Sequence, residues 1–298
     1  MNIRRKKGVF HKLSDSRRRA FTLIEIMVAS VIMIVLTGLV IQITSEVLKV
    51  WNLSSGKLAA NAEARIAMDL LTQDLETAVF RNNEQQWLRI ESPTNVGSPV
   101  AGETVVLHLF SPAMDRPETK PDGTVANGDI CAIAYRLAYG PSYAGSNAPK
   151  TFALYRAIAD SGTTFNTLMG PGTSDPQLVL TDGFWDSANV ADPDNFLAGN
   201  IVDFKVFVYG ADSAGNEVVI NDPDANGTID NNYIFGGTGD TGEDATYVEI
   251  TLTIVSDEGL ELLELPSLAG TGYSSITDIV REHGEVFTRR VNFLARPL

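Results

Sequence analysis

The sequence has few of the residues that most enzymes use for catalysis. It contains one cysteine, Cys131, so no internal disulfide can form, and three histidines, His11, His108 and His283. No glycine-rich phosphate loop opens a helix, and spacing alone places no histidine beside a nucleophile. Carboxylates are abundant, but none is singled out as a glycosidase-type pair. These absences predict a protein that is not an enzyme.

Basic residues are scarce beyond residue 20. Eight of the 23 lysines and arginines lie in residues 1–20, against one of the 37 acidic residues, so the rest of the chain has a net charge of about −21. An acidic body is unsuited to a nucleic-acid backbone, which attracts Lys and Arg. We therefore expect no nucleic-acid partner and an exported soluble body.

One long apolar run is present, from Phe21 to Ile43 (FTLIEIMVASVIMIVLTGLVIQI), and Glu25 is its only formal charge. About 20 apolar residues in a helix are enough to cross a bilayer, so residues 21–43 are predicted to span the membrane. The basic residues before them predict a cytoplasmic N-terminus. A cleaved secretory signal would have its small-residue site after the run, but here the small residue, Ala20, precedes it. An uncleaved signal anchor remains an alternative.

Glu25 is the unusual residue of this run. An ionised side chain inside a span costs at least a few kcal/mol and commonly marks function. Thr22 and Glu25 have the spacing of a capping box, which is favoured at a helix N-terminus. If the chain were cut between Ala20 and Phe21, a new amine would lie four residues from Glu25. The carboxylate could then pair with that amine or with a neighbour's, and the two roles are compatible.

The segment RRRA-FTLIEIMVASVIMIVLTGLV resembles the N-terminus of type IV prepilins and of the pseudopilins of type II secretion. The shared pattern is a short basic leader, a small residue, Phe, Thr-Leu-x-Glu and an apolar helix. The resemblance implies cleavage after Ala20 by prepilin peptidase and N-methylation of Phe21. It also implies that Glu25 aligns subunits during filament assembly. The family usually has Gly at the position of Ala20, so we expect slower cleavage here.

The helix is predicted to continue from Thr22 to Val79, with weak points at Gly38 and at residues 54–56. Its second half has an amphipathic pattern typical of a half-buried helix. The stripe comprises Met68, Leu71, Leu75 and Ala78, with Ile66 and Leu70 beside it.

Beyond residue 80 the sequence predicts antiparallel β-structure with long loops. Segments 202–208 and 248–254 alternate apolar and polar residues, as half-buried strands do. Further strands are predicted at 87–90, 104–110, 130–137, 152–157, 178–180 and 287–293, with loops at 111–128, 138–150, 158–176, 182–199 and 221–245. The predicted fold class is α+β, pilin-like, in four regions. These are a leader over 1–20, a transmembrane segment over 21–43, an amphipathic helix over 44–80 and a periplasmic β-rich head over 81–298.

Residues 221–232, NDPDANGTIDNN, have the pattern of a calcium loop. Positions one, three, five, six, seven and nine are Asp222, Asp224, Asn226, Gly227, Thr228 and Asp230, and alternate oxygens at this spacing converge on a cation. Tyr233 replaces the bidentate glutamate of position twelve, so closure would need Asp240, Glu243 or Asp244. The alternative is a surface turn rich in Asn, Asp and Gly. The pattern predicts weak Ca²⁺ binding through Asp222, Asp224, Asn226, Thr228 and Asp230.

A long helix followed by antiparallel sheet also resembles the larger minor pseudopilins, particularly the J-type, in segments 68–79 and 289–293. This implies a minor subunit of a short periplasmic filament that serves protein secretion from a bacterial inner membrane. The implied partners are prepilin peptidase, other pseudopilins or pilins, and membrane lipid. The alternatives are a minor pilin of a type IV pilus, a lineage-specific pilin-like cassette protein, an anchored periplasmic binding protein or adhesin, and an anchored hydrolase.

Overall fold

The computed structural model describes residues 21–80, 86–92, 104–112, 118–119, 125–126, 130–143, 145, 148–164, 190–227, 229–237, 240–242 and 245–293. The predicted leader and the strand predicted at 178–180 lie outside these residues. The chain divides into two compact units, Met1–Asn52 and Leu53–Leu298.

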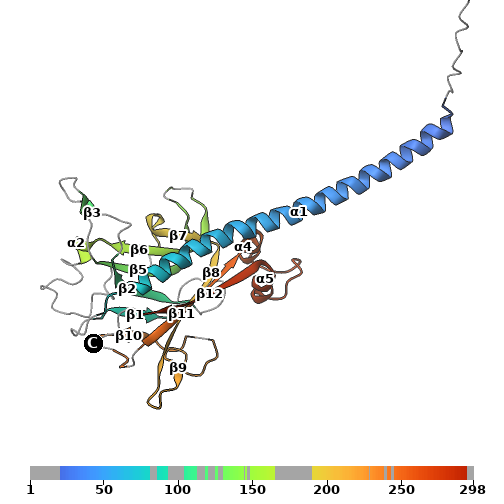
Figure 1. Ribbon diagram of the computed structural model, residues 1–298. Helices are drawn as coiled ribbons and strands as arrows, with labels where there is room; N and C mark the ends of the chain where they lie inside the picture. The colour runs from blue at the N-terminus through green and yellow to red at the C-terminus, as the bar shows by residue number, and fades with distance from the viewer. Residues whose placement is uncertain are drawn as a thin grey trace, which may run out of the picture. The chain divides into compact units, whose positions relative to one another are not determined.

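The elements follow the order of a long helix and then many strands (Figure 1). In chain order they are α1 (Leu23–Glu76), β1 (Leu88–Glu91), β2 (Val106–Ser111), β3 (Glu118–Thr119), β4 (Val125–Ala126), β5 (Cys131–Pro141), β6 (Lys150–Ala159), α2 (Ser161–Thr163), η4 (Pro193–Asn195), β7 (Phe196–Gly199), β8 (Ile201–Ala211), β9 (Glu217–Val219), β10 (Tyr233–Phe235), β11 (Ala245–Val255), α4 (Asp257–Leu263), α5 (Ile276–His283) and β12 (Gly284–Asn292).

Helix α1 is continuous over 54 residues, so neither of the predicted weak points breaks it. Gly38 has no neighbour near its Cβ position and Gly56 has only Asp257, so each is accommodated within the helix. The helix ends at Glu76, three residues before the predicted end. The following turn is closed by hydrogen bonds, and the amide of Val79 donates to Phe110 O at 2.8 Å.

In the first unit every described residue from Phe21 to Asn52 is exposed. Of the helices that the structure describes, α1 is long and apolar enough to cross a membrane, by length and composition. Such a surface has no intramolecular partner among the described residues, and this is the expected result for a segment whose solvent is lipid.

In the second unit α1 packs one stripe into the core of the β-rich head. The buried residues recur at helical spacing: Ala60, Ala64, Ala67, Met68, Leu71, Leu75 and Ala78. The predicted stripe at 68, 71, 75 and 78 is confirmed. Ile66 does not lie beside this stripe, because its side chain is 59% exposed. It is two residues from Met68, about 200° around the helix.

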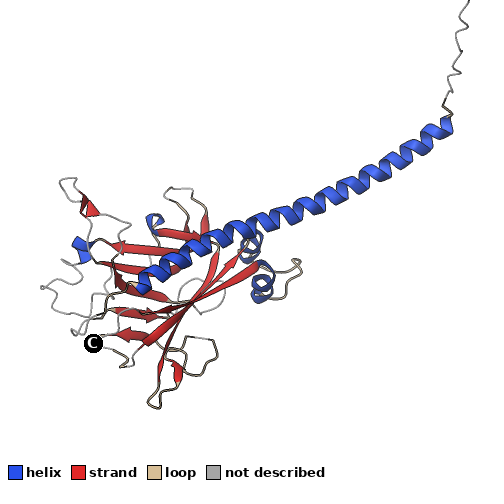
Figure 2. Cartoon of the chain, in the orientation of Figure 1, coloured by secondary structure: helices blue, strands red, loops and turns tan. Residues whose placement is uncertain are grey.

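Two larger antiparallel sheets and a two-stranded sheet of β3 and β4 complete the described part of the head (Figure 2). The two larger sheets have six and four strands. One has the order β10-β1-β2-β5-β6-β7, and the other has the order β12-β11-β8-β9. The alternation predicted for 202–208 and 248–254 is confirmed, because Phe204 pairs with Leu252 and Val206 with Ile250 in the antiparallel register of β8 and β11. Residues of α1 and of both sheets belong to one hydrophobic core.

A buried ion pair fastens α1 to the larger sheet. Asp74 on α1 is 3% exposed and accepts from Arg156 Nε on β6 at 2.8 Å and from Nη2 at 3.0 Å. Tyr135 on β5 donates its hydroxyl to the same carboxylate at 2.5 Å. Burial raises the pKa of Tyr135 well above its ordinary value, so the phenol keeps its proton and acts as a donor. Paired and hydrogen-bonded in this way, the charges are tolerated in the core.

Several elements lie where the sequence predicted loops. β7 falls in the loop predicted at 182–199, β10 falls in the loop predicted at 221–245, and β5 and β6 extend into 138–150. In the last case Tyr139 pairs with Phe152 across the two strands, and their rings lie 4.8 Å apart. Cross-strand packing of this kind stabilises strands that intrinsic propensity does not favour.

Candidate functional site

The N-terminal end of α1 is organised by Thr22 and Glu25. The amide and the hydroxyl of Thr22 donate to Glu25 Oε2 at 2.9 and 3.0 Å, and the amide of Glu25 donates to Thr22 Oγ1 at 3.3 Å. These reciprocal bonds form a capping box, as the Thr-x-x-Glu spacing predicts. Among the described residues no group donates to Glu25 Oε1. The carboxylate therefore has one oxygen held locally and one that can accept a further donor.

Phe21 precedes this box and is 80% exposed. Ala20, the predicted residue before the cleavage point, lies outside the described residues. Phe21 and Glu25 are separated by about one helical turn. An amine on Phe21 would therefore lie close to the same carboxylate.

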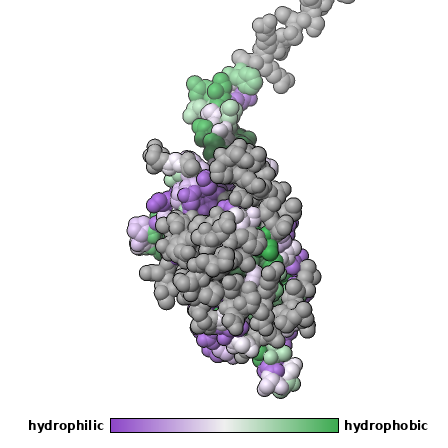
Figure 3. All heavy atoms as spheres, turned by 90° about the vertical axis from the view of Figure 1, so that its left-hand side faces the viewer, coloured by the Kyte–Doolittle hydropathy of each residue, from purple (hydrophilic) through white to green (hydrophobic). Residues whose placement is uncertain are grey.

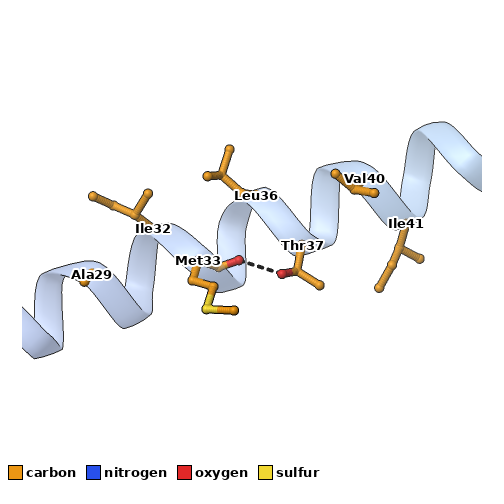
Figure 4. A pocket seen from close by; sticks show the side chains of 7 residues that line it. All are labelled: Ala29, Ile32, Met33, Leu36, Thr37, Val40 and Ile41. Carbon is orange, nitrogen blue, oxygen red and sulfur yellow. Dashed lines mark hydrogen bonds between the residues drawn. The ribbon is translucent and has the colours of Figure 1, made fainter.

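The apolar surface that follows has a shallow hollow on one side of the helix. It is lined by Ala29, Ile32, Met33, Leu36, Thr37, Val40 and Ile41 (Figure 4). Ala29 has the smallest side chain of the seven and leaves space between larger neighbours. In the space-filling view the visible part of the described helix has a mostly hydrophobic surface (Figure 3). A lipid chain or the apolar ridge of another helix fits a surface of this chemistry.

Three hydroxyl side chains of this helical segment are satisfied by the helix itself. Ser30 Oγ donates to Met27 O at 2.8 Å, Thr37 Oγ1 to Met33 O at 2.8 Å, and Thr44 Oγ1 to Val40 O at 2.7 Å. Hydroxyls bonded to the preceding turn need no water. The segment therefore presents very little unsatisfied polarity to its surroundings.

The predicted calcium loop brings three of its carboxylates together. One oxygen from each of Asp222, Asp224 and Asp230 lies within 4.8 Å of the others. Desolvation and the negative charges of Asp224 and Asp222 raise the pKa of Asp230. Carboxylate oxygens that converge in this way fit a hard cation such as Ca²⁺.

The backbone of the loop is held by Asp222 and Asn221. Asp222 is 3% exposed and accepts from the amides of Asn226 at 3.2 Å and Gly227 at 2.9 Å. Gly227 has a φ of 86°, which fits the sharp turn that the pattern requires. The side chain of Asn221 bonds to Val206 O and Val208 N of β8, both at 2.8 Å, and fixes the loop to the sheet. The sequence analysis missed Asn221, and its only signal was its place before the first aspartate.

Not every predicted ligand joins this group. Thr228, Glu243 and Asp244 lie outside the described residues. Asn226 Nδ2 donates to Asp224 Oδ2 at 2.9 Å, so the side-chain amide of Asn226 is hydrogen-bonded to one of the three carboxylates. Asp240 accepts from the amides of Gly236 and Gly242 in its own turn, and it is not one of the three grouped acids.

Among the described histidines, His283 lies between two hydroxyl groups. His283 Nε2 lies 2.7 Å from the hydroxyl of Tyr273, and Nδ1 lies 3.4 Å from Ser256 Oγ. Ser256 is 2% exposed and accepts from Gly259 N as the N-cap of α4. Its hydroxyl is therefore engaged in capping. Cys131 is also buried.

The chain has a capped apolar helix with a glutamate in its first turn, followed by an antiparallel β-sheet head, which is the arrangement that the resemblance to type IV prepilins predicts. Residues 15–41 match the family of the prokaryotic N-terminal methylation motif. Among solved structures, the chain is similar to a type IV-like pilin from Thermus thermophilus. The two are 11% identical, with 78% of this chain and 96% of that chain covered and a TM-score of 0.37. No curated protein matches the chain.

Proposed function

We propose that this protein is a minor pseudopilin-like subunit of a short periplasmic filament, processed by prepilin peptidase and serving protein secretion. The observation that carries the proposal is the methylation motif at residues 15–41, which ends in an exposed apolar helix with Glu25 at its start. A helix of this kind is stable in lipid before assembly and offers an apolar surface to other subunits afterwards.

The geometry around Glu25 supports the assembly role that we propose for it. Thr22 engages Oε2 and leaves Oε1 for a donor that arrives from outside. The mature amine of Phe21 is positively charged and lies at the N-terminal end of the helix, where Glu25 is. The amine that pairs with Glu25 can belong to the same subunit or to a neighbouring one. A pair formed in an apolar surrounding is strongly favoured over two separated charges. Glu25 would therefore set the axial position of one subunit against the next.

The test is the mass of the mature N-terminus in the native membrane. Intact-mass and peptide analysis should show a chain that begins at Phe21 and carries one added methyl group. A mature chain that retains residues 1–20 would reduce the segment to a signal anchor. Co-purification with other subunits that start Phe-Thr-x-x-Glu would separate a filament subunit from an anchored binding protein.

We further propose that the loop at 221–232 binds Ca²⁺ weakly. The supporting observation is the convergence of Asp222, Asp224 and Asp230 on one point. Three like charges this close repel each other unless a cation or water intervenes. Bound Ca²⁺ would neutralise them and brace the loop against β8.

A further inference from the structure

Two carboxylates bracket the uncharged part of the exposed helix. Glu25 and Glu46 enclose residues 26–45, which contain no Asp, Glu, Lys or Arg. These 20 residues are helical and exposed throughout. At 1.5 Å per residue they extend about 30 Å. That length equals the thickness of the hydrocarbon core of a typical bilayer, also about 30 Å.

The polar atoms between the two glutamates are compatible with hydrocarbon. The hydroxyls of Ser30, Thr37 and Thr44 each bond to a carbonyl of the preceding turn, and Ser45 is the last residue of the segment, next to Glu46. Gln42 carries the one side-chain amide of the segment. It lies four residues from Glu46, about one turn, so its side chain can reach toward the same interface.

The residues just beyond Glu46 are of the types found among lipid headgroups. Lys49 can extend its ammonium toward the phosphates, and Trp51 is an amphipathic aromatic with 71% of its surface exposed. Trp51 lies six residues beyond Ser45, about 9 Å along the helix. The headgroup layer on each side is about 5–7 Å thick. The backbone of Trp51 therefore lies just outside that layer, and its large amphipathic side chain can reach back into it.

We propose that residues 26–45 are the part of the chain that lies in hydrocarbon, and that bilayer lipid is what covers their exposed surface. Glu25 and Glu46 then lie at the two interfaces, and Lys49 and Trp51 lie among the outer headgroups. The inference rests on the membrane anchoring in the proposed function. It moves the centre of the span from residue 32, the middle of 21–43, to the bond between residues 35 and 36.

This register changes the environment of Glu25. At an interface the carboxylate is hydrated and stays ionised at low cost, whereas inside hydrocarbon it would be costly. In the anchored subunit Glu25 therefore remains ionised and can later pair with an amine. The free energy of pairing becomes available only when the helix leaves the bilayer and enters an apolar assembly.

The test uses two tryptophan substitutions placed equally far from the inferred centre. In a Trp51→Phe background, Val28→Trp and Ile43→Trp each lie 7.5 residues from the bond between 35 and 36. The full chain is reconstituted in phosphatidylcholine vesicles brominated deep in the acyl chains, and fluorescence quenching is measured. The Trp51→Phe chain supplies the contribution of Trp87 and Trp185. We expect the two substituted tryptophans to be quenched equally.

A span centred on residue 32 gives a different result. Val28 would then lie about 6 Å and Ile43 about 16 Å from the bilayer centre. Val28→Trp would be quenched several-fold more than Ile43→Trp, and that inequality would overturn the register. Native Trp51 should be quenched only weakly by bromine near the acyl carbonyl and not by deep bromine. Quenching of Trp51 by deep bromine would overturn its position outside the hydrocarbon.

Leu36→Trp separates this inference from the proposed anchoring. The residue lies within hydrocarbon in either register, so deep bromine should quench it strongly. Strong quenching of Leu36→Trp with unequal quenching of the matched pair would refute the register alone. An unquenched Leu36→Trp would remove the membrane span and the proposed anchoring with it.

Discussion

The two halves of α1 are built from the same secondary structure but face different solvents. Between Phe21 and Asn52 apolar residues occur all around the helix, and every described side chain is exposed. Between Ala60 and Ala78 most of the apolar residues form one buried stripe, and most of the charged residues lie on the other faces. Propensity alone would make both halves helical. The distribution of charge around the axis determines whether the helix belongs in lipid or against a sheet.

The first half can be tested at its single charge near the N-terminus. Glu25→Val removes the carboxylate but leaves the cleavage point and the apolar surface. We expect normal processing and an almost complete loss of incorporation into filaments, because no acid remains to pair with the neighbouring amine. Crosslinking between subunits in the native membrane measures incorporation. Glu46→Val is the matched control and should crosslink normally. Undiminished crosslinking of the Glu25 variant would leave Glu25 with a capping role only.

The second half depends on the ion pair that fastens it to the sheet. Arg156→Ala leaves the carboxylate of Asp74 buried and unpaired, so we expect the head to lose about 3–5 kcal/mol of unfolding free energy. Urea unfolding of the full chain in detergent measures the loss. Arg281→Ala breaks the pair with Asp278, in which the Arg281 side chain is 77% exposed, and should cost about 1 kcal/mol or less.

A double variant sharpens this result. Asp74→Leu combined with Arg156→Met replaces two buried charges by apolar side chains of similar volume, and it is made and compared in a Tyr135→Phe background because the Tyr135 hydroxyl would otherwise lose its acceptor. It should cost less than Arg156→Ala alone, because no charge is left unpaired in the core. A larger loss of unfolding free energy in the double variant would show that the ion pair itself stabilises the head. The cost of Arg156→Ala would then not come only from leaving Asp74 unpaired.

Packing gives a smaller contrast within the same half. Leu71 is fully buried and Ile66 is 59% exposed, although both are large aliphatic residues on one helix. Leu71→Ala should cost about 2–5 kcal/mol, since it removes buried methyl groups and leaves a cavity. Ile66→Ala should change stability by about 0.5 kcal/mol or less. Equal losses in the two variants, measured by the same urea unfolding, would contradict the assignment of the buried stripe.

The sequence predicted the long elements and missed the short ones. The 54-residue helix and the strands β8 and β11 have a periodicity that extends over many residues, so their faces could be assigned. β9 and β10 have three residues each, too few to show a period. α4 and α5 begin after Ser256 and Ser275, whose side chains cap them. These serines were the available signal, and they were not used.

The contacts of the candidate sites also fall into two groups: contacts that are local in sequence, which could be predicted, and contacts that depend on tertiary structure, which could not. The contact between Thr22 and Glu25 is local, so spacing predicted it. The loop aspartates are also close in sequence, and their convergence followed from the alternate pattern. The contact between Asp74 and Arg156 joins residues 82 positions apart, and no local pattern could have paired them. The attachment of Asn221 to β8 also depends on tertiary structure, because a hydrogen bond to a strand edge requires the strand to be in place.

The smallest expected effect concerns the predicted calcium loop in the head. Ca²⁺ should stabilise the head through this loop and should not affect the exposed helix. If Ca²⁺ bridges Asp222, Asp224 and Asp230, it binds the folded head and stabilises it by mass action. Without the glutamate at position twelve we expect a dissociation constant of about 10⁻⁴–10⁻³ M. At tenfold excess over that constant, the gain is about 1.4 kcal/mol. The melting temperature should then rise by about 3–6 °C.

The effect also has a defined pH dependence. The pKa of Asp230 is raised because burial and the nearby charges of Asp224 and Asp222 disfavour its ionised form. The folded state therefore bears an electrostatic cost above this raised pKa, and the cost disappears as the pH falls through it. Ca²⁺ competes with the proton for the same oxygens. Its stabilising effect should be full at neutral pH and should be lost in the acidic range.

Thermal unfolding at several Ca²⁺ concentrations measures the effect, with Mg²⁺ as a comparison that should help less because it holds its waters more tightly. The double variant Asp222→Ala, Asp224→Ala should abolish the shift. Because Asp222 also accepts from the amides of Asn226 and Gly227, this variant lowers the starting melting temperature for a second reason. Asp230→Asn is the cleaner variant, since it removes one ligand charge and leaves those amide contacts in place. A wild-type melting temperature that does not change with Ca²⁺ would make the loop a solvated surface turn.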